Sequence, residues 1–330
     1  MQLIDHPDIH DPALNLAMEE YALRNLPGGR DYLLFYINEP SIIIGKNQNT
    51  AEEINARYVE DNGIHVVRRL SGGGAVYHDL GNLNFSFVTN DDGKSFHNFR
   101  KFTEPVVRAL RKLGVDAELT GRNDLQVGDR KISGNAQFAS KGRMFSHGTL
   151  LFDSNIDAVA AALNANPEKF KSKSSKSVRS RVANITEFLS EPMTVEAFKA
   201  RLLDSIYEGR TPERYTLTEE DWKEVRKLAD ERYRSWEWNY GRSPEFNVRK
   251  LKRLAAGTYD LRLFVESGVI RDAAIYGDFF GVGDAPEFAG MLQGVRYDAQ
   301  AIRGLIESVD LPHYFGPVTP EEWLDLFFYE

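Results

Sequence analysis

The chain has 330 residues, a net charge of -8 from 41 Lys and Arg against 49 Asp and Glu, and no cysteine. Without cysteine, disulfides, Cys-ligated zinc, iron–sulfur sites and a cysteine nucleophile are excluded. The acidic balance argues against nucleic acid as a partner, because neutralising phosphates requires clustered basic side chains, and weakly against an anionic membrane surface.

The localisation we expect is cytoplasmic. No apolar run reaches the roughly 18 residues that a membrane span requires. The first residues also lack the basic-then-apolar layout of a secretory signal.

The N-terminal quarter alternates helix and strand signals. Asp11 followed by Pro12 is typical of a helix start, and we expect this helix to run to about residue 26. Further along, the pattern predicts strands at 32–37, 41–44 and 64–69, a helix at about 51–62 and a glycine loop at 70–74.

The next hundred residues favour strands joined by tight turns. Leu83, Phe85 and Phe87 alternate with residues 84, 86 and 88, which is the period of a half-buried strand. A helix is expected at 99–113, a hairpin at 125–139 that turns at 128–129, and a strand at 144–152 after a turn at 141–142. Because the elements do not follow strict βαβ order, we predict an α/β (α+β) fold: a mixed or antiparallel sheet with packed helices.

The sequence pattern of the C-terminal third predicts a second, smaller domain. Helices at about 194–208 and 218–233 precede a tryptophan-rich junction at 236–244. A hairpin and two helices follow, at 258–266 with 269–276, 299–308 and 320–328. We therefore expect a catalytic domain at 1–245 and a small C-terminal domain at 246–330, which is near the size limit for independent folding.

The first candidate site is the glycine-rich stretch from Arg68 to Asp79. Its three consecutive glycines, residues 72–74, let backbone amides approach an anion closely and form a concave nest. A preceding arginine adds a fork of donors for carboxylate or phosphate. The stretch is neither a Walker A loop nor the start of a Rossmann helix. The alternative reading is a flexible hairpin turn.

The second candidate is the hairpin that follows Gly121-Arg122-Asn123-Asp124. Strand alternation predicts that Lys131, Ser133, Asn135 and Gln137 share one face. A lysine among small and amide side chains resembles the floor of a polar site, where a compact charge can stabilise a reaction between a carboxylate and a phosphate. A solvated strand face with an exposed lysine is the alternative.

Two further elements are weaker signals. His147 and Thr149 share a predicted strand face, although a lone histidine is more often a structural residue. The stretch at 164–182 crowds six basic residues, Lys169 and Arg179 among them, between serines. We interpret it as a mobile loop, either a solvated segment or a lid that excludes water from an intermediate; a nucleic-acid patch is disfavoured because Phe170 is its one aromatic residue.

Together these motifs resemble the lipoate–protein ligase A family. Residues 68–79 look like the signature glycine loop of the family, and the later motifs match in order and approximate spacing. They are Leu80–Phe87, Gly121–Leu125, Lys131–Gly134, His147–Leu151 and Ser177–Asn184, and the stretch at 236–247 resembles the junction to the family's C-terminal domain.

The resemblance implies a fold and an activity. The fold is a catalytic domain like those of biotin ligases and class II aminoacyl-tRNA synthetases, with a small α/β accessory domain. The activity joins lipoate and ATP, with Mg²⁺, to lipoyl-AMP, and then transfers the lipoyl group to a lysine. The implied acceptors are apo lipoyl domains of 2-oxoacid dehydrogenase E2 subunits and the glycine cleavage H protein, with neither nucleic acid nor membrane as a partner.

The resemblance also implies roles for individual residues. Lys131 would be the catalytic residue that touches both the lipoate carboxyl group and the α-phosphate. Asp124 would lie near the phosphates, through Mg²⁺, and the loop at 169–181 would close on the adenylate. The remaining substrate-binding residues implied are Arg69, Ser71, Gly72, Gly73, Gly74, Ala75, Val76, Tyr77, Asn82, Ser133, His147 (at the lipoate entrance), Gly148, Thr149 and Arg179, with Ser71–Gly74 gating the lipoyl tail.

Three alternative functions are excluded to different degrees by the sequence. An octanoyltransferase or amidotransferase that forms a thioester on cysteine is excluded by composition. A biotin ligase is disfavoured, because its glycine loop carries a Gly-Arg-Gly-Arg type of sequence. A non-catalytic lipoate- or nucleotide-binding sensor or adaptor remains, and retention of Lys131 and Asp124 argues against it.

Overall fold

The computed structural model describes residues 1–163, 181–240, 248–266, 268–297 and 299–328. These residues form two compact units. The first consists of Met1–Ile43, Ala51–Arg69 and Val76–Asn239, and the second of Ile44–Thr50, Leu70–Ala75 and Tyr240–Glu330. The second unit thus gathers two short segments from the N-terminal quarter, the glycine loop among them. The predicted domain boundary at 245/246 stays a prediction.

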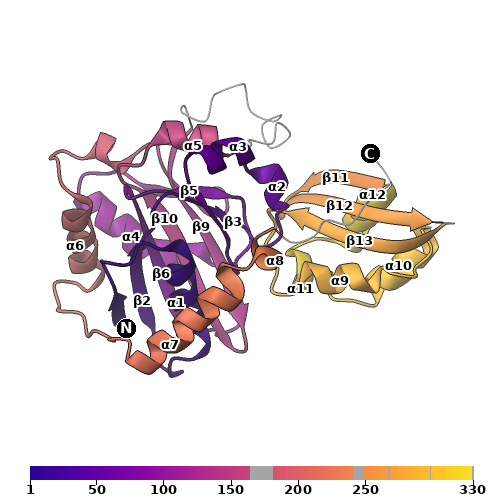
Figure 1. Cartoon of the computed structure of the whole chain (residues 1–330), viewed down its shortest axis with the longest axis horizontal. Helices are drawn as coiled ribbons and strands as arrows, with labels where there is room; N and C mark the ends of the chain where they lie inside the picture. The colour runs from indigo at the N-terminus through magenta and orange to yellow at the C-terminus, as the bar shows by residue number, and fades with distance from the viewer. Residues whose placement is uncertain (164–180, 241–247, 267, 298, 329–330) are drawn as a thin grey trace. The chain divides into compact units, whose positions relative to one another are not determined.

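A seven-stranded sheet is the centre of the first unit (Figure 1). Its first two strands pair in parallel and all the others pair antiparallel, which confirms the predicted mixed sheet. The strands, in spatial order, are β1 (Gln2–Asp5), β2 (Tyr32–Ile37), β6 (Asn82–Asn90), β10 (Arg143–Leu151), β9 (Arg130–Ser140), β8 (Asp124–Val127) and β7 (Glu118–Thr120). A small sheet of β4 (His65–Arg68), β3 (Ser41–Ile44) and β5 (Val76–His78) adjoins it.

Helices cover both faces of the large sheet (Figure 1). On one face, α4 (Phe99–Lys112) and α6 (Val195–Ile206) bury apolar residues against Leu83, Phe85 and other core residues. On the other lies α1 (Pro12–Arg24), which Asp11 caps as predicted by accepting from the amides of residues 13 and 14. The remaining helices of this unit are α2 (Thr50–Glu53), α3 (Ala56–Asp61), α5 (Ile156–Ala162), α7 (Glu219–Leu228) with a π-helical turn at Ala229–Tyr233, α8 (Trp236–Asn239) and a 3-10 turn at Ile185–Phe188.

Among the elements of this unit, one helix and one strand differ from the sequence prediction. The helix expected at 51–62 is divided, because the Asn55 side chain accepts from the amide of Tyr58 and starts a new helix there. Strand β6 is buried on both faces rather than half-buried, since Asn82, Asn84 and Ser86 are at most 2% exposed beneath α1. A buried row of polar side chains therefore runs through the first unit.

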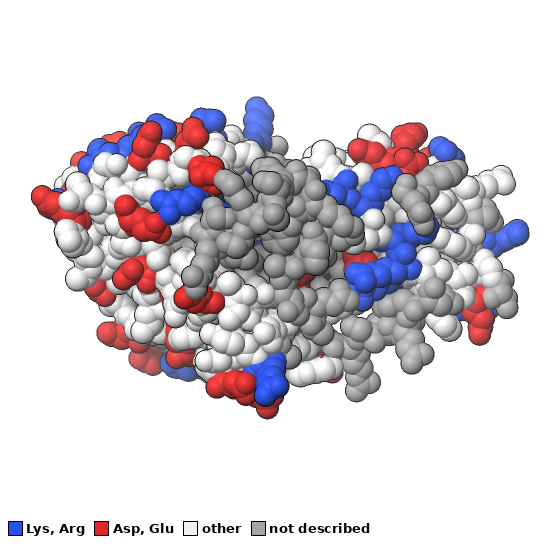
Figure 2. Space-filling model, turned by 90° about the horizontal axis from the view of Figure 1, so that it is seen from above, with Lys and Arg blue, Asp and Glu red and all other residues white. Residues whose placement is uncertain are grey.

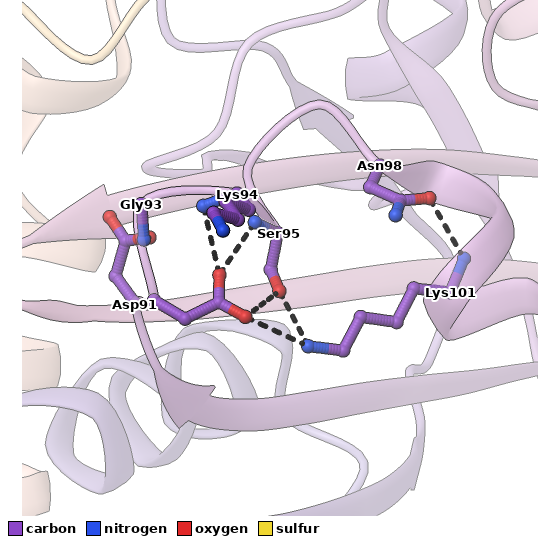
Figure 3. Close-up of polar contacts among 7 residues, drawn as sticks. Asp91, Gly93, Lys94, Ser95, Asn98 and Lys101 are labelled. Atoms are coloured by element: carbon purple, nitrogen blue, oxygen red, sulfur yellow. Dashed lines mark hydrogen bonds and ion pairs between the residues drawn. The ribbon is translucent and has the colours of Figure 1, made fainter.

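Carboxylates accept backbone hydrogen bonds in the connection from β6 to α4, and Asp92 accepts most of them (Figure 3). Asp92 accepts from the amides of Lys94 and Ser95 and from the Ser95 hydroxyl, at 2.7–2.9 Å. These bonds, led by that of the Lys94 amide, hold the pKa of Asp92 well below its usual range. The loop is also tied to β9, because the His97 amide donates to Gln137.

The second unit packs helices on one face of a three-stranded sheet, β11 (Val248–Leu254), β12 (Gly257–Glu266) and β13 (Val269–Gly277). Its helices are α9 (Ala285–Met291), α10 (Ala299–Glu307), α11 (Leu311–Phe315) and α12 (Pro320–Phe328). The hairpin, α10 and α12 were predicted; β11, α9 and α11 were missed.

Lys and Arg side chains gather on the side of β11 (Figure 2). This edge strand carries four basic residues, and such charges discourage edge-to-edge pairing of sheets. Within the described ranges, no helix is long and apolar enough to cross a bilayer.

Candidate active site

Lys131 lies on the opposite sheet face from the one that strand alternation predicts. In the β8–β9 ladder Leu125 pairs with Ser133 but Gln126 pairs with Lys131, so Ile132 is an extra residue in a β-bulge. A Cβ placed on Gly134 would meet Lys131 Nζ at 3.1 Å, which puts the lysine on the side of Gly134. The prediction that Lys131 shares a face with Ser133, Asn135 and Gln137 was therefore wrong, because the bulge reverses the alternation.

On its new face Lys131 meets other predicted site residues. Its Nζ lies 2.8 Å from Asp124 Oδ1, with both side chains about one-third exposed (33% and 32%). The Gly134 amide between them donates to Thr149 Oγ1 at 3.1 Å. Asp124, Lys131 and Thr149 thus surround one glycine, where a partly exposed ammonium is pre-oriented by a carboxylate and can still receive a ligand.

Ser133 and Gly148 belong to the other side of the sheet. Ser133 is fully buried and accepts from Asn135 Nδ2, while a Cβ on Gly148 would collide with Asn135 Oδ1 and the ring of Phe85. On the face of Lys131, these two residues can therefore offer a ligand backbone groups rather than side chains.

His147 is held by a partner that the sequence analysis missed. Its Nδ1 lies 2.9 and 3.0 Å from the two carboxylate oxygens of Glu19 in α1, and both side chains are buried. Because a carboxylate only accepts, Nδ1 carries the hydrogen and the ring orientation is set. The signal was available: Glu19 and Glu20 are consecutive acidic residues in an otherwise apolar stretch of helix.

A polar row on β6 lies directly beside this histidine. The register pairs Ser86 with His147 and Asn84 with Thr149, and Asn82 Nδ2 donates to Asn84 Oδ1. Among the described residues, Asn82 Oδ1 and Ser86 Oγ are buried without a hydrogen-bond partner. Since buried polar atoms are normally paired, such atoms are suited to receive a polar ligand.

Arg69 is a buried cation next to the small sheet. It is 5% exposed and donates from Nη1 to the carbonyl of Ile43 at 2.9 Å. Burial lowers the pKa of Arg69 to about 10, so it stays charged at neutral pH. Val76 and Tyr77 follow in β5, paired with Ile43 and Ile42, and burial raises the pKa of Tyr77 to about 12.

The glycine loop, Leu70–Ala75, is packed within the second unit rather than being a solvated turn. Ser71, Gly72 and Gly73 are buried, whereas Gly74 and Ala75 are partly exposed. A Cβ on Gly72 would lie 2.3 Å from the carbonyl oxygen of Phe279, and Gly73 has a φ of 89° that favours glycine. Close packing and positive φ explain why these positions are glycines.

Two predicted features are left untested by the structure. Arg179 and nearly all of the loop at 169–181 fall outside the described residues, apart from Arg181, whose carbonyl accepts from the Lys131 amide. In the described ranges, no group of three or more His, Cys, Asp or Glu side chains is placed to hold a metal ion.

Two stretches of the chain match known protein families. Residues 11–207 match the lipoyl protein ligase A/B catalytic domain, and residues 243–327 match the bacterial lipoate protein ligase C-terminus. Lipoate-protein ligase LplJ from Bacillus subtilis (strain 168) is 59% identical, covering 99% of this chain and all of that protein. Lipoate–protein ligase 1 from Staphylococcus aureus (strain Mu50) is 55% identical, covering 99% of both.

Solved structures show the same similarity. LipL1 of P. falciparum in complex with lipoate has a TM-score of 0.78 at 25% identity, covering 98% of this chain and 96% of that one. A bipartite lipoate protein ligase from Thermoplasma acidophilum, described with its E2 lipoyl domain, has a TM-score of 0.65 at 36% identity. The match covers 75% of this chain and 98% of that one. A lipoate-protein ligase A bound with ATP has a TM-score of 0.63 at 33% identity, and the match covers 73% of this chain and 97% of that one.

Proposed function

Because the chain belongs to the lipoyl protein ligase A/B family, we propose that it activates lipoate with ATP and transfers the lipoyl group to a lysine of a partner protein. In the first step a lipoate carboxylate oxygen attacks the α-phosphorus, the bond to the β-phosphate oxygen breaks, and pyrophosphate leaves. In the second step the amine of the acceptor lysine attacks the acyl carbon, AMP leaves, and the amine loses a proton.

Lys131 is the catalytic residue in this proposal. The first step brings two anions together, and a cation between them damps their repulsion and stabilises the charge that develops. The observation that carries the assignment is the bulge, which turns Lys131 onto the polar face beside Asp124 and Thr149 and leaves its side chain one-third exposed. A lysine held in place by a carboxylate is pre-organised for that task.

The other predicted residues bind rather than react. Arg69 supplies a buried positive charge, and the amides of Gly74, Ala75, Val76 and Tyr77 are donors for the nucleotide and the acyl carbonyl. Asn82 contributes an unpaired buried oxygen, and His147, oriented by Glu19, lines the lipoate entrance. Ser71–Gly73, Ser133, Gly148, Thr149 and Arg179 complete the set, and the loop at 169–181 is the proposed lid over the adenylate.

Mg²⁺ is a separate part of the proposal. Asp124 would hold it jointly with phosphate oxygens, because one carboxylate plus substrate phosphates is a common way for Mg²⁺ to bind. The ion would neutralise phosphate charge. If so, Asp124→Asn raises the Mg²⁺ concentration needed for half-maximal pyrophosphate release. An unchanged Mg²⁺ requirement would leave Asp124 only its contact with Lys131.

Acceptor, location and domain roles are also proposals. A structurally similar ligase is described with an E2 lipoyl domain, so we propose apo lipoyl domains of E2 subunits, and the glycine cleavage H protein, as acceptors. We place the reaction in the cytoplasm, where ATP is available. Residues 1–245 would carry catalysis and residues 246–330 an accessory role.

The test is pyrophosphate release with ATP and Mg²⁺, using lipoate, octanoate or biotin as the acid, with and without an apo lipoyl domain. We expect lipoate-dependent release and mass-spectrometric transfer of a lipoyl group when the domain is present. Release with biotin but not lipoate would overturn the substrate assignment. Binding of lipoate without release would favour a non-catalytic binding protein.

A further inference from the structure

The glycine loop is held by a segment from the far end of the chain. Within the second unit, the turn after β3 lies against the loop, where the Lys46 amide donates to the Ser71 carbonyl at 2.9 Å. The segment after β13 contacts both: the Gly277 amide donates to the Asn47 carbonyl at 2.5 Å, and the Phe279 carbonyl occupies the space beside Gly72. The loop backbone is therefore seated on backbone groups of residues 277–279.

One ion pair stabilises the contact between the turn after β3 and the segment after β13. Lys46 Nζ lies 3.0 Å from Asp284 Oδ1 and 3.3 Å from the Gly283 carbonyl oxygen, and the lysine side chain is only 13% exposed. Asp284 is the N-cap residue of α9, yet its side chain makes no capping hydrogen bond to that helix. A carboxylate at this position ordinarily caps its own helix. Here it faces Lys46 instead.

The Asp284 end of the contact is anchored. The amides of Val282 and Gly283 both donate to the His313 carbonyl at 2.8 Å, and a Cβ on Gly281 would lie 1.9 Å from the Tyr314 carbonyl oxygen. The segment is thus fixed to α11. The turn at Ile44–Thr50, which the Lys46–Ser71 bond joins to the loop, contacts the chain at that fixed point.

We propose that Asp284 is a positioning residue for the ligase reaction: through Lys46 it sets the conformation of Leu70–Ala75, whose amides bind substrate. The inference rests on the proposed function only for the role of those amides. If the ion pair is removed, the loop spends less time in its binding conformation. The apparent dissociation constant then rises by the inverse of the competent fraction, while the chemistry of the bound complex is unchanged.

The experiment compares Asp284→Asn with the matched variant Asp325→Asn. Asparagine is as good an N-cap as aspartate, so Asp284→Asn removes mainly the charge. Asp325 forms a similar ion pair with Lys252, at 3.6 Å with the Asp325 side chain 53% exposed. We measure KM for ATP and for lipoate, kcat, and hydrogen exchange of the amides of Leu70–Ala75. We also test whether the charge swap Lys46→Glu with Asp284→Lys restores them.

We expect KM for at least one substrate to rise about threefold in Asp284→Asn, with kcat retained, in line with the small energy of partly exposed ion pairs. Loop amides should exchange faster, Asp325→Asn should behave like wild type, and the charge swap should recover at least half of the loss. Wild-type KM and wild-type loop exchange in Asp284→Asn would overturn the inference, as would a fall in kcat alone. No lipoate-dependent release by the wild-type enzyme would instead overturn the proposed function, and loop exchange would still decide the positioning role.

Discussion

The lysine hairpin at 124–134 and the glycine loop at 70–75 are both assigned to substrate, but they are supported in different ways. The hairpin is shaped mainly by its own neighbours, through a glycine turn, a one-residue bulge and an ion pair between Asp124 and Lys131. Two backbone hydrogen bonds also join Lys131 to Arg181 and Ala183. The loop depends on residues from the other end of the chain, such as Phe279 and Asp284. Ligase activity should therefore fall when the reactive side chain of the hairpin is removed. For the glycine loop, activity should fall when its packing on the distant residues is disturbed.

The largest effect should come from removing the chemistry of the hairpin. We expect Lys131→Ala to lower lipoate-dependent pyrophosphate release by about 10²- to 10³-fold, because loss of one preorganised donor to developing charge has an effect of that size. Circular dichroism should show an intact fold, since the lysine side chain is partly exposed. Lys223→Ala, which removes an exposed lysine paired with Glu220, is the control. A folded Lys131→Ala enzyme with near wild-type release would contradict the assignment.

The glycine loop should respond to packing instead. In Gly72→Ala the new Cβ would lie 2.3 Å from the Phe279 carbonyl, so backbone must shift, whereas a Cβ on Gly74 meets nothing within 4 Å. We expect Gly72→Ala to lower kcat/KM by about ten- to a hundredfold, since small displacements of positioning groups are costly. Gly74→Ala should lower it less. Equal losses in the two variants would show that packing on Phe279 does not position the loop.

The buried Glu19–His147 pair is both distant and local. Glu19 lies far from His147 in the sequence, but its effect is confined to the orientation of the His147 ring. Glu19→Gln keeps the shape and replaces a charge-assisted hydrogen bond with a neutral one, so we expect a loss of about 1–2 kcal/mol in the free energy of unfolding. Urea denaturation measures it. Glu187→Gln, at a partly exposed pair with Arg130, should cost less. If both variants lost the same free energy of unfolding, burial would not make the Glu19–His147 pair more stabilising than the partly exposed pair.

A pH-dependent effect should mark the interior of the first unit. Burial, followed by the charges of Arg69 and His147, lowers the pKa of His78 to about 3. The unfolded chain takes up a proton near pH 6.5 while the folded chain does not, so stability is full above that pH and falls below it. His78 alone should contribute at most about 1.4 kcal/mol per pH unit between roughly pH 6.5 and 3.

The comparison of wild type with His78→Gln isolates this contribution. The free energy of unfolding is measured at pH 7, 6 and 5, a range in which other histidines contribute equally to both proteins. We expect a shallower decline in His78→Gln. Parallel declines would mean that folding does not lower the pKa of His78.

How much of the site the sequence could predict depended on the range of the interactions involved. The helix start at Asp11-Pro12 and the turns at 128–129 and 141–142 were predicted correctly, because capping and turn geometry depend on adjacent residues. The face of Lys131 was predicted wrongly, since a bulge changes register without leaving a clear signal in composition. Glu19 was missed because its partner, His147, lies 128 residues away.

By itself, the sequence determined the family, the mixed sheet, most of the helices and the residues that carry charge, because these follow from local patterns and from motifs in a set order. Only the tertiary structure decided which way Lys131 points, which carboxylate orients His147, and that the glycine loop is seated on residues 277–284. The first outcome depends on a bulge in strand pairing, and the other two depend on pairing between distant segments. Such pairing is settled by how well surfaces pack and polar groups are satisfied, and no stretch of neighbouring residues specifies it.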